Sequence, residues 1–132
     1  IKDSVSEKVY QRALFVSREN TRTLKAAELI QEGNIQEFGA LMYQTHEGLS
    51  KNYEVSCPEL DFLVERSKEF PQVVGSRMMG GGFGGCTINL VHENFVDEFI
   101  VLATNAYKKK FNVDLTSILV ATSNGVEITR PA

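Results

Sequence analysis

A run of glycines in the middle of the chain is the feature whose residue types could do chemistry. Five of the six residues between positions 80 and 85 are glycine, half of the ten glycines in the chain. Such a run is costly, because each glycine loses more backbone freedom on folding than any other residue. It is favoured where the backbone needs positive φ angles, or where its amides bind an anion such as phosphate. The candidate site residues are therefore Gly80, Gly81, Gly82, Phe83, Gly84 and Gly85.

Short apolar stretches on both sides of the run predict that it joins two strands, over residues 73–79 and 86–91. The spacing of Gly80, Gly82 and Gly85 also matches the dinucleotide-binding pattern G-x-G-x-x-G, but that pattern requires a helix after the loop. The glycine loop of protein kinases lies between strands, but its companion motifs are absent from this sequence. The alternatives that stay open are an anion-binding or closely packed loop and a plain hairpin connection.

Two helices are predicted before this loop, over residues 4–31 and 35–50, because apolar residues recur there at helical spacing. Ser4 followed by Glu7 fits a capping box for the first helix. Its apolar stripe consists of Val5, Val9, Ala13, Val16, Leu24, Ala27 and Ile30. Its solvated face is expected to carry Arg12, Arg18, Glu19 and Arg22, although Arg18 and Arg22 could instead face a partner domain.

Two further helices are predicted on either side of the strands. Ser56 can cap the first of them, with Pro58 in its first turn and Glu59 completing a capping box. Asn94 is expected to cap the other, over residues 95–110, which ends in three lysines that suit the negative end of the helix dipole.

Two more strands, over residues 118–121 and 126–128, are expected to follow, joined by an Asn124-Gly125 turn. This order of helices and strands predicts an α+β domain.

The remaining polar and sulfur-containing residues give weaker signals. His46 lies beside the apolar stripe of its helix, where a lone histidine is expected to be structural and not catalytic. Cys57 and Cys86 occur without secretory features, which favours free thiols in the cytoplasm over a disulfide. No set of residues has the spacing of a metal site. The net charge of −3 argues against a nucleic-acid partner, and no apolar run is long enough to span a membrane.

The stretch from Gly75 to Thr87 resembles the third signature of the GHMP kinases, which act on galactose, homoserine, mevalonate and phosphomevalonate. The stretch from Tyr53 to Asp61 resembles the galactokinases within that superfamily, and the likeness runs from about Arg12 to about Ile128. It implies an antiparallel ferredoxin-like sheet covered by helices. It also implies transfer of the γ-phosphoryl group of ATP, with Mg, to the anomeric hydroxyl of galactose. Met79 stands where the family usually has Thr, and Lys51-Asn52 stands where it often has acidic residues.

The resemblance further implies that residues 1–132 are a single domain, the C-terminal part of a longer two-domain kinase. The catalytic aspartate, the assisting arginine and most sugar contacts then belong to the N-terminal domain. We therefore expect no catalytic residue and no metal ligand in this chain, and no kinase activity from it alone. Its partners would be its own N-terminal domain, galactose and ATP. An exposed interdomain face could also let the isolated piece dimerise.

For the glycine run, we expect the backbone to shape the interdomain cleft, with Ser76 and Arg77 in supporting positions. Phe83 could pack under the loop or form a wall of the cleft, and packing under the loop is favoured. Two rival hypotheses stay open. One is a related GHMP kinase for another sugar, such as N-acetylgalactosamine or arabinose. The other is a standalone ferredoxin-like regulatory module whose glycine loop binds a small anion.

Overall fold

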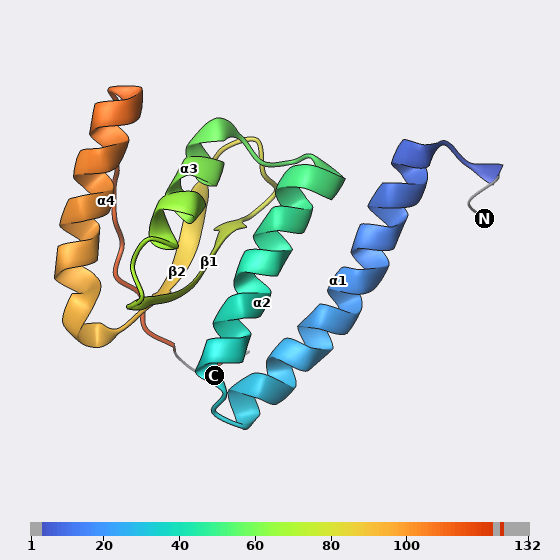
Figure 1. The fold of residues 1–132 in the computed structure, drawn as a ribbon, viewed down its shortest axis with the longest axis horizontal. Helices are drawn as coiled ribbons and strands as arrows, with labels where there is room; N and C mark the ends of the chain where they lie inside the picture. Colours follow the sequence, from blue (N-terminus) through green and yellow to red (C-terminus); the bar gives the residue numbers. More distant parts are fainter. Residues whose placement is uncertain (1–3, 123–124, 126–132) are drawn as a thin grey trace, which may run out of the picture.

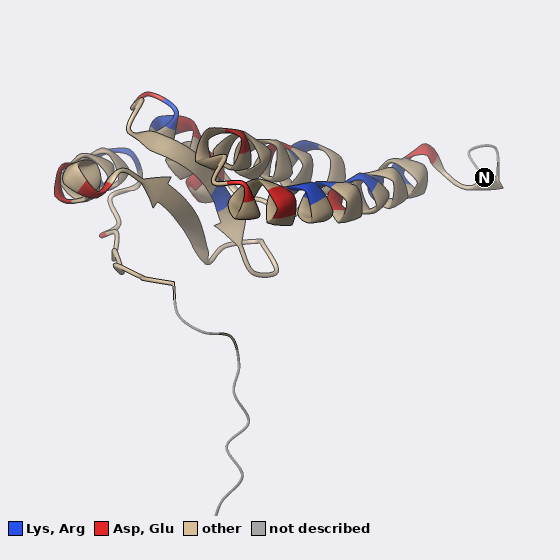
Figure 2. Cartoon of the chain, turned by 90° about the horizontal axis from the view of Figure 1, so that it is seen from below, with Lys and Arg blue, Asp and Glu red and all other residues tan. Residues whose placement is uncertain are grey.

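The computed structural model describes residues 4–122 and residue 125, and its elements form an α+β arrangement (Figure 1). In chain order the elements are α1 (Glu7–Gln31), α2 (Ile35–Gly48), the π-helical turn η2 (Leu49–Tyr53), α3 (Pro58–Ser67), β1 (Val73–Met79), β2 (Cys86–Val91), the 3-10 turn η3 (Glu93–Phe95) and α4 (Val96–Phe111). Seen from below, the helices form a layer on one side of the strands, and α1 extends away from the rest (Figure 2). The α+β class is confirmed.

The sheet of the described residues consists of β1 and β2, which pair antiparallel. Met79 lies opposite Cys86, so the glycine run closes the end of this hairpin. At the other end Val73 lies opposite Val91, and the register shifts between Val73 and Gly75. The prediction of two antiparallel strands joined by the glycine run is confirmed.

The strand predicted over residues 118–121 is wrong, because these residues have no regular secondary structure. Ile118, Leu119 and Val120 are exposed to 81%, 78% and 70%. A short apolar run forms a strand only where it can pair with a neighbour and cover one face, and no described strand pairs with this one. The turn predicted at Asn124-Gly125 and the strand predicted over residues 126–128 lie outside the described residues, apart from Gly125.

Helix α2 crosses β1 at unusually close range, and two glycines make this possible. A Cβ atom on Gly39 would lie 2.1 Å from the carbonyl oxygen of Val74, and one on Gly75 would lie 2.6 Å from the Cα of Gly39. Nearby, the hydroxyl of Tyr43 donates to the carbonyl oxygen of Val73 at 3.3 Å and lies 3.1 Å from the hydroxyl of the buried Ser67. This crossing fixes the strand that leads into the glycine run.

Helix α1 buries the face opposite to the one that its apolar stripe predicts to be buried. Its buried residues are Phe15 and Leu29, and a Cβ on Gly48 would lie 2.3 Å from the Phe15 ring. The stripe is exposed instead, with Val9 at 53%, Val16 at 44%, Leu24 at 70% and Ile30 at 54%. These values concern the described chain alone, so the stripe is available for a further contact.

Charged residues of α1 that were expected to be solvated lie partly against α2. Arg12, Glu19 and Arg22 are half-buried, whereas Arg18 is exposed. The carboxylate of Glu19 accepts a hydrogen bond of 2.7 Å from the hydroxyl of Thr45 and forms an ion pair with Arg22. Because these charges are paired, α1 can turn its polar face inward without leaving an isolated buried charge.

The predicted start of α2 at Ile35 is confirmed, whereas the predicted starts of the other helices are off by one to three residues. The side chain of Ser6, not Ser4, accepts from the backbone N–H of Val9 and caps α1. Asn94 does not cap α4, because Glu93–Phe95 form a 3-10 turn and the N-cap Phe95 makes no side-chain bond. The lysines at the end of α4 do lie in its last turn, as predicted.

Candidate functional site

The glycine run has a backbone that only glycine adopts readily. Positive φ angles occur at Gly80 (88°), Gly82 (87°), Phe83 (61°), Gly84 (139°) and Gly85 (97°), and Gly81 has none. Residues with a side chain are strained in this region, so the composition of the run follows from its conformation. A plain two-residue hairpin turn would need fewer such positions.

The run lies directly on the main chain of Val55, which precedes α3. The backbone N–H of Phe83 donates to the carbonyl oxygen of Val55 at 2.7 Å. A Cβ on Gly82 would lie 2.1 Å from that oxygen and 2.9 Å from the Val55 Cβ. The close approach expected of this loop is therefore made, within the described chain, at Gly82 and against Val55. A Cβ on Gly80, Gly81 or Gly84 would meet no atom of the described residues within 4 Å.

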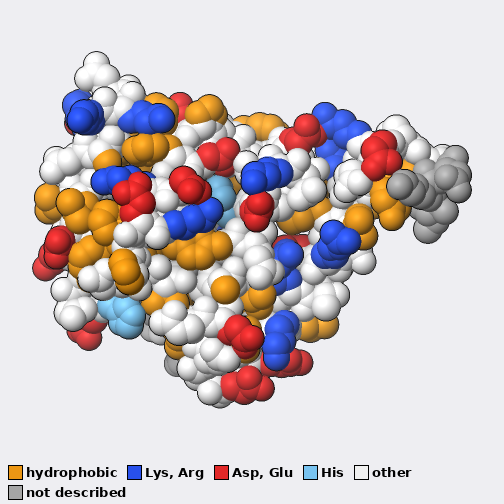
Figure 3. All heavy atoms as spheres, in the orientation of Figure 1, with side chains coloured by type: hydrophobic (Ala, Val, Ile, Leu, Met, Phe, Trp, Pro, Cys, Tyr) orange, Lys and Arg blue, Asp and Glu red, His pale blue; other side chains and the backbone are white. Residues whose placement is uncertain are grey.

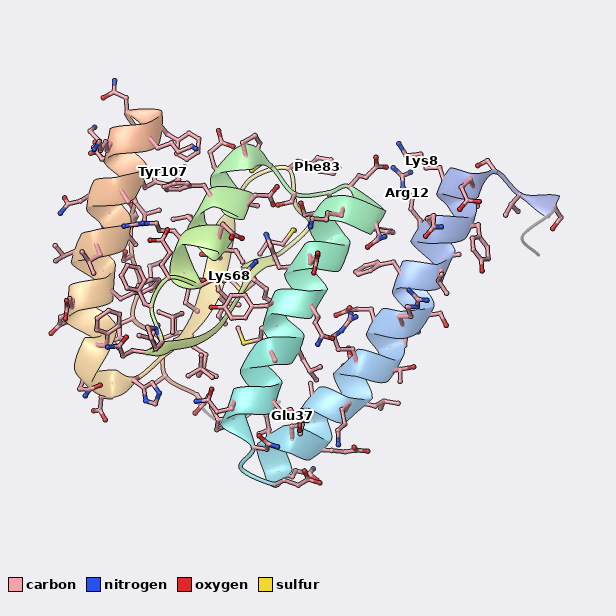
Figure 4. All side chains as sticks on the ribbon, viewed as in Figure 1. Lys8, Arg12, Glu37, Lys68, Phe83 and Tyr107 are labelled. Atoms are coloured by element: carbon pink, nitrogen blue, oxygen red, sulfur yellow. The ribbon has the colours of Figure 1, made fainter. Side chains whose placement is uncertain are left out.

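The prediction that Phe83 packs under the loop is wrong. Its side chain is 77% exposed, and its left-handed backbone turns the N–H toward Val55. Figure 4 places Phe83 at the same end of the molecule as Lys8 and Arg12 of α1. An exposed aromatic ring on a constrained loop suits contact with another molecule or domain better than it suits a core position.

The segment before α3 that supports the loop is itself held in place. The backbone N–H of Val55 donates to the carbonyl oxygen of Leu49 at 3.0 Å. Glu54 adopts the left-handed conformation, with φ 61°, and its carboxylate pairs with Lys8 at 2.8 Å and with Arg12 at 3.1 Å. These ion pairs are exposed to water and screened by it, so they contribute little to stability.

Asp61 connects this segment to α2 and accepts hydrogen bonds from three side chains. The hydroxyl of Ser56 donates to its Oδ1 at 2.5 Å, and the hydroxyl of Ser50 donates to its Oδ2 at 3.0 Å. The Nε2 of His46 lies 3.2 Å from Oδ1. The predicted capping box is therefore wrong: the N-cap of α3 is Cys57, which makes no side-chain bond, while Ser56 binds Asp61.

His46 is buried and hydrogen-bonded at both ring nitrogens, which confirms its predicted structural character. Its Nδ1 accepts from the backbone N–H of Met78 at 3.2 Å, so a neutral ring carries its proton on Nε2, toward Asp61. Burial lowers the pKa of His46, and the Asp61 carboxylate offsets this only in part. An unfolded chain therefore takes up the His46 proton at higher pH than the folded one. The stability contributed by neutral His46 is lost as pH falls from about 6.5 through the lower folded pKa.

The two supporting residues lie in β1. Ser76 is fully buried, and its hydroxyl donates to the Oδ1 of Asn89 in β2 at 2.6 Å. Arg77 is half-buried and lies opposite Ile88. Ser76 thus stabilises the hairpin below the loop, through a buried polar contact that its sequence pattern did not reveal.

Four other features of the described residues bear on function: the thiols, metal ligands, membrane helices and surface grooves. Cys57 and Cys86 are free thiols, as predicted. Within residues 4–122 and 125, no three His, Cys, Asp or Glu side chains come together as metal ligands. No helix among them has the length and apolar character needed to cross a membrane. A groove of about 400 Å³ between α1 and α2 is lined by residues including Arg18 and Arg22 and does not include the glycine run.

Comparison with protein families gives one decisive match. The family described as GHMP kinases C terminal matches residues 26–106, which is more than half of the chain and includes the glycine run, Val55, Asp61 and His46. The chain belongs to the GHMP kinases. The hairpin closed by the glycine run lies inside the region that this family matches.

The curated relatives of this GHMP kinase chain are galactokinases. It is 47% identical to the enzyme of Bacillus subtilis over 76% of the chain and 26% of the relative. It is 40% identical to that of Clostridium acetobutylicum over 96% of the chain and 33% of the relative. It is 50% identical to the human enzyme over 68% of the chain and 23% of the relative. The chain therefore spans about a quarter to a third of the length of these relatives.

A solved structure of a galactokinase has the same fold as this chain. Lactococcus lactis galactokinase in complex with galactose matches with a TM-score of 0.79 and 36% sequence identity, over 83% of this chain and 28% of that one. The GHMP kinase chain therefore has the fold of the corresponding part of a galactokinase.

Proposed function

We propose that this chain is the C-terminal domain of a cytoplasmic, two-domain galactokinase. The whole enzyme transfers the γ-phosphoryl group of ATP, bound with Mg as a substrate complex, to the anomeric hydroxyl of galactose. The observation that carries the proposal is the glycine run, whose strained backbone rests on Val55 and which lies in the region that the GHMP family matches. The galactose in the Lactococcus lactis complex supports the choice of sugar.

The role of this domain is to form one wall of the active-site cleft. Gly80, Gly81 and Gly84 have open space where a Cβ would lie, so a ligand or the second domain can approach the backbone closely. Phosphoryl transfer depends on in-line positioning and on neutralising developing charge. A loop held rigidly against Val55 contributes positioning, whereas the groups that bind MgATP and activate the hydroxyl belong to the N-terminal domain.

We expect the 132-residue chain alone to show no galactose-dependent ATP turnover. Within its described residues there is no cluster of carboxylates that could hold Mg, and the catalytic groups are assigned to the missing domain. The measurement is a coupled ADP-release assay with galactose, with the full-length protein as positive control. Turnover by the purified chain above the no-galactose rate would contradict this division of labour.

The upstream part of the same polypeptide is the partner that we assign to the exposed face of α1. Val9, Val16, Leu24 and Ile30 lie along this face, and Figure 3 shows hydrophobic side chains among the charged ones over α1. Periodic apolar residues on a helix are normally buried. Since these curated relatives are about three times as long as the chain, the remaining part is large enough to cover this face.

Leu24→Glu tests this assignment, because Leu24 is 70% exposed in the described chain. We expect the substitution to change the unfolding free energy of the 132-residue chain by less than about 0.5 kcal/mol. In the full-length protein it should cost about 2 kcal/mol or more, because a charge would then be buried. Thermal or urea unfolding of both proteins gives the values, with Lys25→Gln at the next, exposed position as control. Equal effects in both proteins would show that the face stays in solvent.

A further inference from the structure

His46 is part of a closed ring of contacts, made of hydrogen bonds and short stretches of main chain, that includes the first half of the glycine run. The backbone N–H of Met78 donates to Nδ1 of His46, whose Nε2 lies 3.2 Å from Asp61. Asp61 accepts from Ser56, which is next to Val55 in the chain. The carbonyl oxygen of Val55 accepts from Phe83, and the chain from Phe83 back to Met78 closes the ring.

We propose that His46 is a positioning residue for phosphoryl transfer, which fixes both ends of the segment from Met78 to Phe83 without touching substrate. This inference rests on the proposed function. His46 lies in α2, more than thirty residues before the loop in sequence, so nothing local links the two. Its ring is buried, and each nitrogen has a fixed partner, which gives the loop one defined position over Val55.

The two ring nitrogens have separate tasks in this ring of hydrogen bonds. Nδ1 holds the strand end that enters the loop, and Nε2 holds the Asp61 carboxylate that supports the Val55 segment. Protonation of His46 would put a second N–H against the N–H of Met78 and remove that bond. The charged groups that act on His46 are Asp61, Glu65 and Lys68 of α3, while β1 presents the backbone N–H of Met78.

Two substitutions separate these tasks, because the amide of Asn reaches the position of Nδ1 and that of Gln reaches the position of Nε2. His46→Asn should keep an acceptor for the N–H of Met78. His46→Gln should keep the bond to Asp61 but leave the N–H of Met78 buried without an acceptor. Tyr43→Phe is the control, since it removes other buried hydrogen bonds of α2 that lie outside the ring.

Hydrogen exchange of the full-length variants is the first measurement, and it needs no enzymatic activity. We expect the amide of Met78 to exchange at least about tenfold faster in His46→Gln than in wild type, and the amide of Phe83 to do so in His46→Asn, which loses the contact with Asp61. Tyr43→Phe should change the exchange of both amides little. Unchanged protection in His46→Gln would overturn the proposal, whatever reaction the enzyme catalyses.

Galactose kinetics of the same variants is the second measurement. We expect kcat to fall by about tenfold or more with little change in KM in both His46→Gln and His46→Asn at neutral pH, because each variant releases one end of the loop. Tyr43→Phe should stay within about threefold of wild type. His46→Asn should also lose an acid limb of the kcat profile that Tyr43→Phe keeps, because Asn does not titrate. A kcat of both His46 variants equal to that of Tyr43→Phe, or an unchanged pH profile in His46→Asn, would reduce His46 to a packing role. Absence of galactose turnover in the wild-type protein would instead count against the proposed function.

Discussion

Gly82→Val in the full-length protein should lower kcat by at least about 100-fold, the size of effect expected when a loop at an active site is misplaced by about 1 Å. The backbone of Gly82 has φ 87°, and its Cβ would lie 2.1 Å from the carbonyl oxygen of Val55. Valine is β-branched and fits neither the positive φ angle nor the short distance to the Val55 oxygen, so the loop must move away from Val55. Steady-state kinetics with galactose and ATP measures the effect. Circular dichroism should show a folded protein, since the loop lies outside the core.

Gly81→Val is the matched control for this substitution. Gly81 has an ordinary φ, and a Cβ there would meet nothing within 4 Å of the described chain. Its effect on stability should therefore be small, within about 1 kcal/mol. A loss of turnover in this variant would come from whatever approaches the loop from outside. Full activity in both variants would contradict the role of the loop as a wall of the cleft.

Gly39→Val should destabilise the protein by about 3 kcal/mol or more, because a Cβ on Gly39 would lie 2.1 Å from a backbone oxygen of β1. Moving α2 and β1 apart would also open the close contact between Gly75 and Gly39. The measurement is equilibrium urea unfolding of the full-length protein, monitored in this domain. Gly81→Ala serves as the reference, at a glycine that has open space around it. A Gly39 variant as stable as that reference would mean that the crossing is looser than the structure describes.

The fold was predictable from the sequence where a local pattern determines the structure. Apolar spacing predicts the four helices and both strands, and the glycine run marks the hairpin between them. Apolar patterns whose burial or pairing depends on a partner distant in the sequence do not predict the observed structure. The stripe on α1 indicates burial, but it is exposed in the described chain, and the run over residues 118–121 has no strand to pair with.

The candidate site was predictable only in part, for a similar reason. Positive φ angles explain the glycines themselves, and these were identified from composition. The support of the loop was missed, because Val55 acts through its carbonyl oxygen and leaves no side-chain signal. Ser56 matches a helix cap in sequence, yet its hydroxyl donates to Asp61, a choice that depends on where α2 places His46.

The most direct test of the account is a phosphorylation assay of the full-length protein that contains this chain. ATP should be supplied with galactose, N-acetylgalactosamine, arabinose and no sugar in parallel, and the sugar phosphate should be identified. The account predicts galactose-dependent ADP release with phosphate on the anomeric oxygen, and much slower turnover of the other sugars. Preferential turnover of another sugar would keep the GHMP kinase mechanism but contradict the assigned substrate. No turnover of any sugar would contradict the account as a whole and favour a regulatory, anion-binding domain.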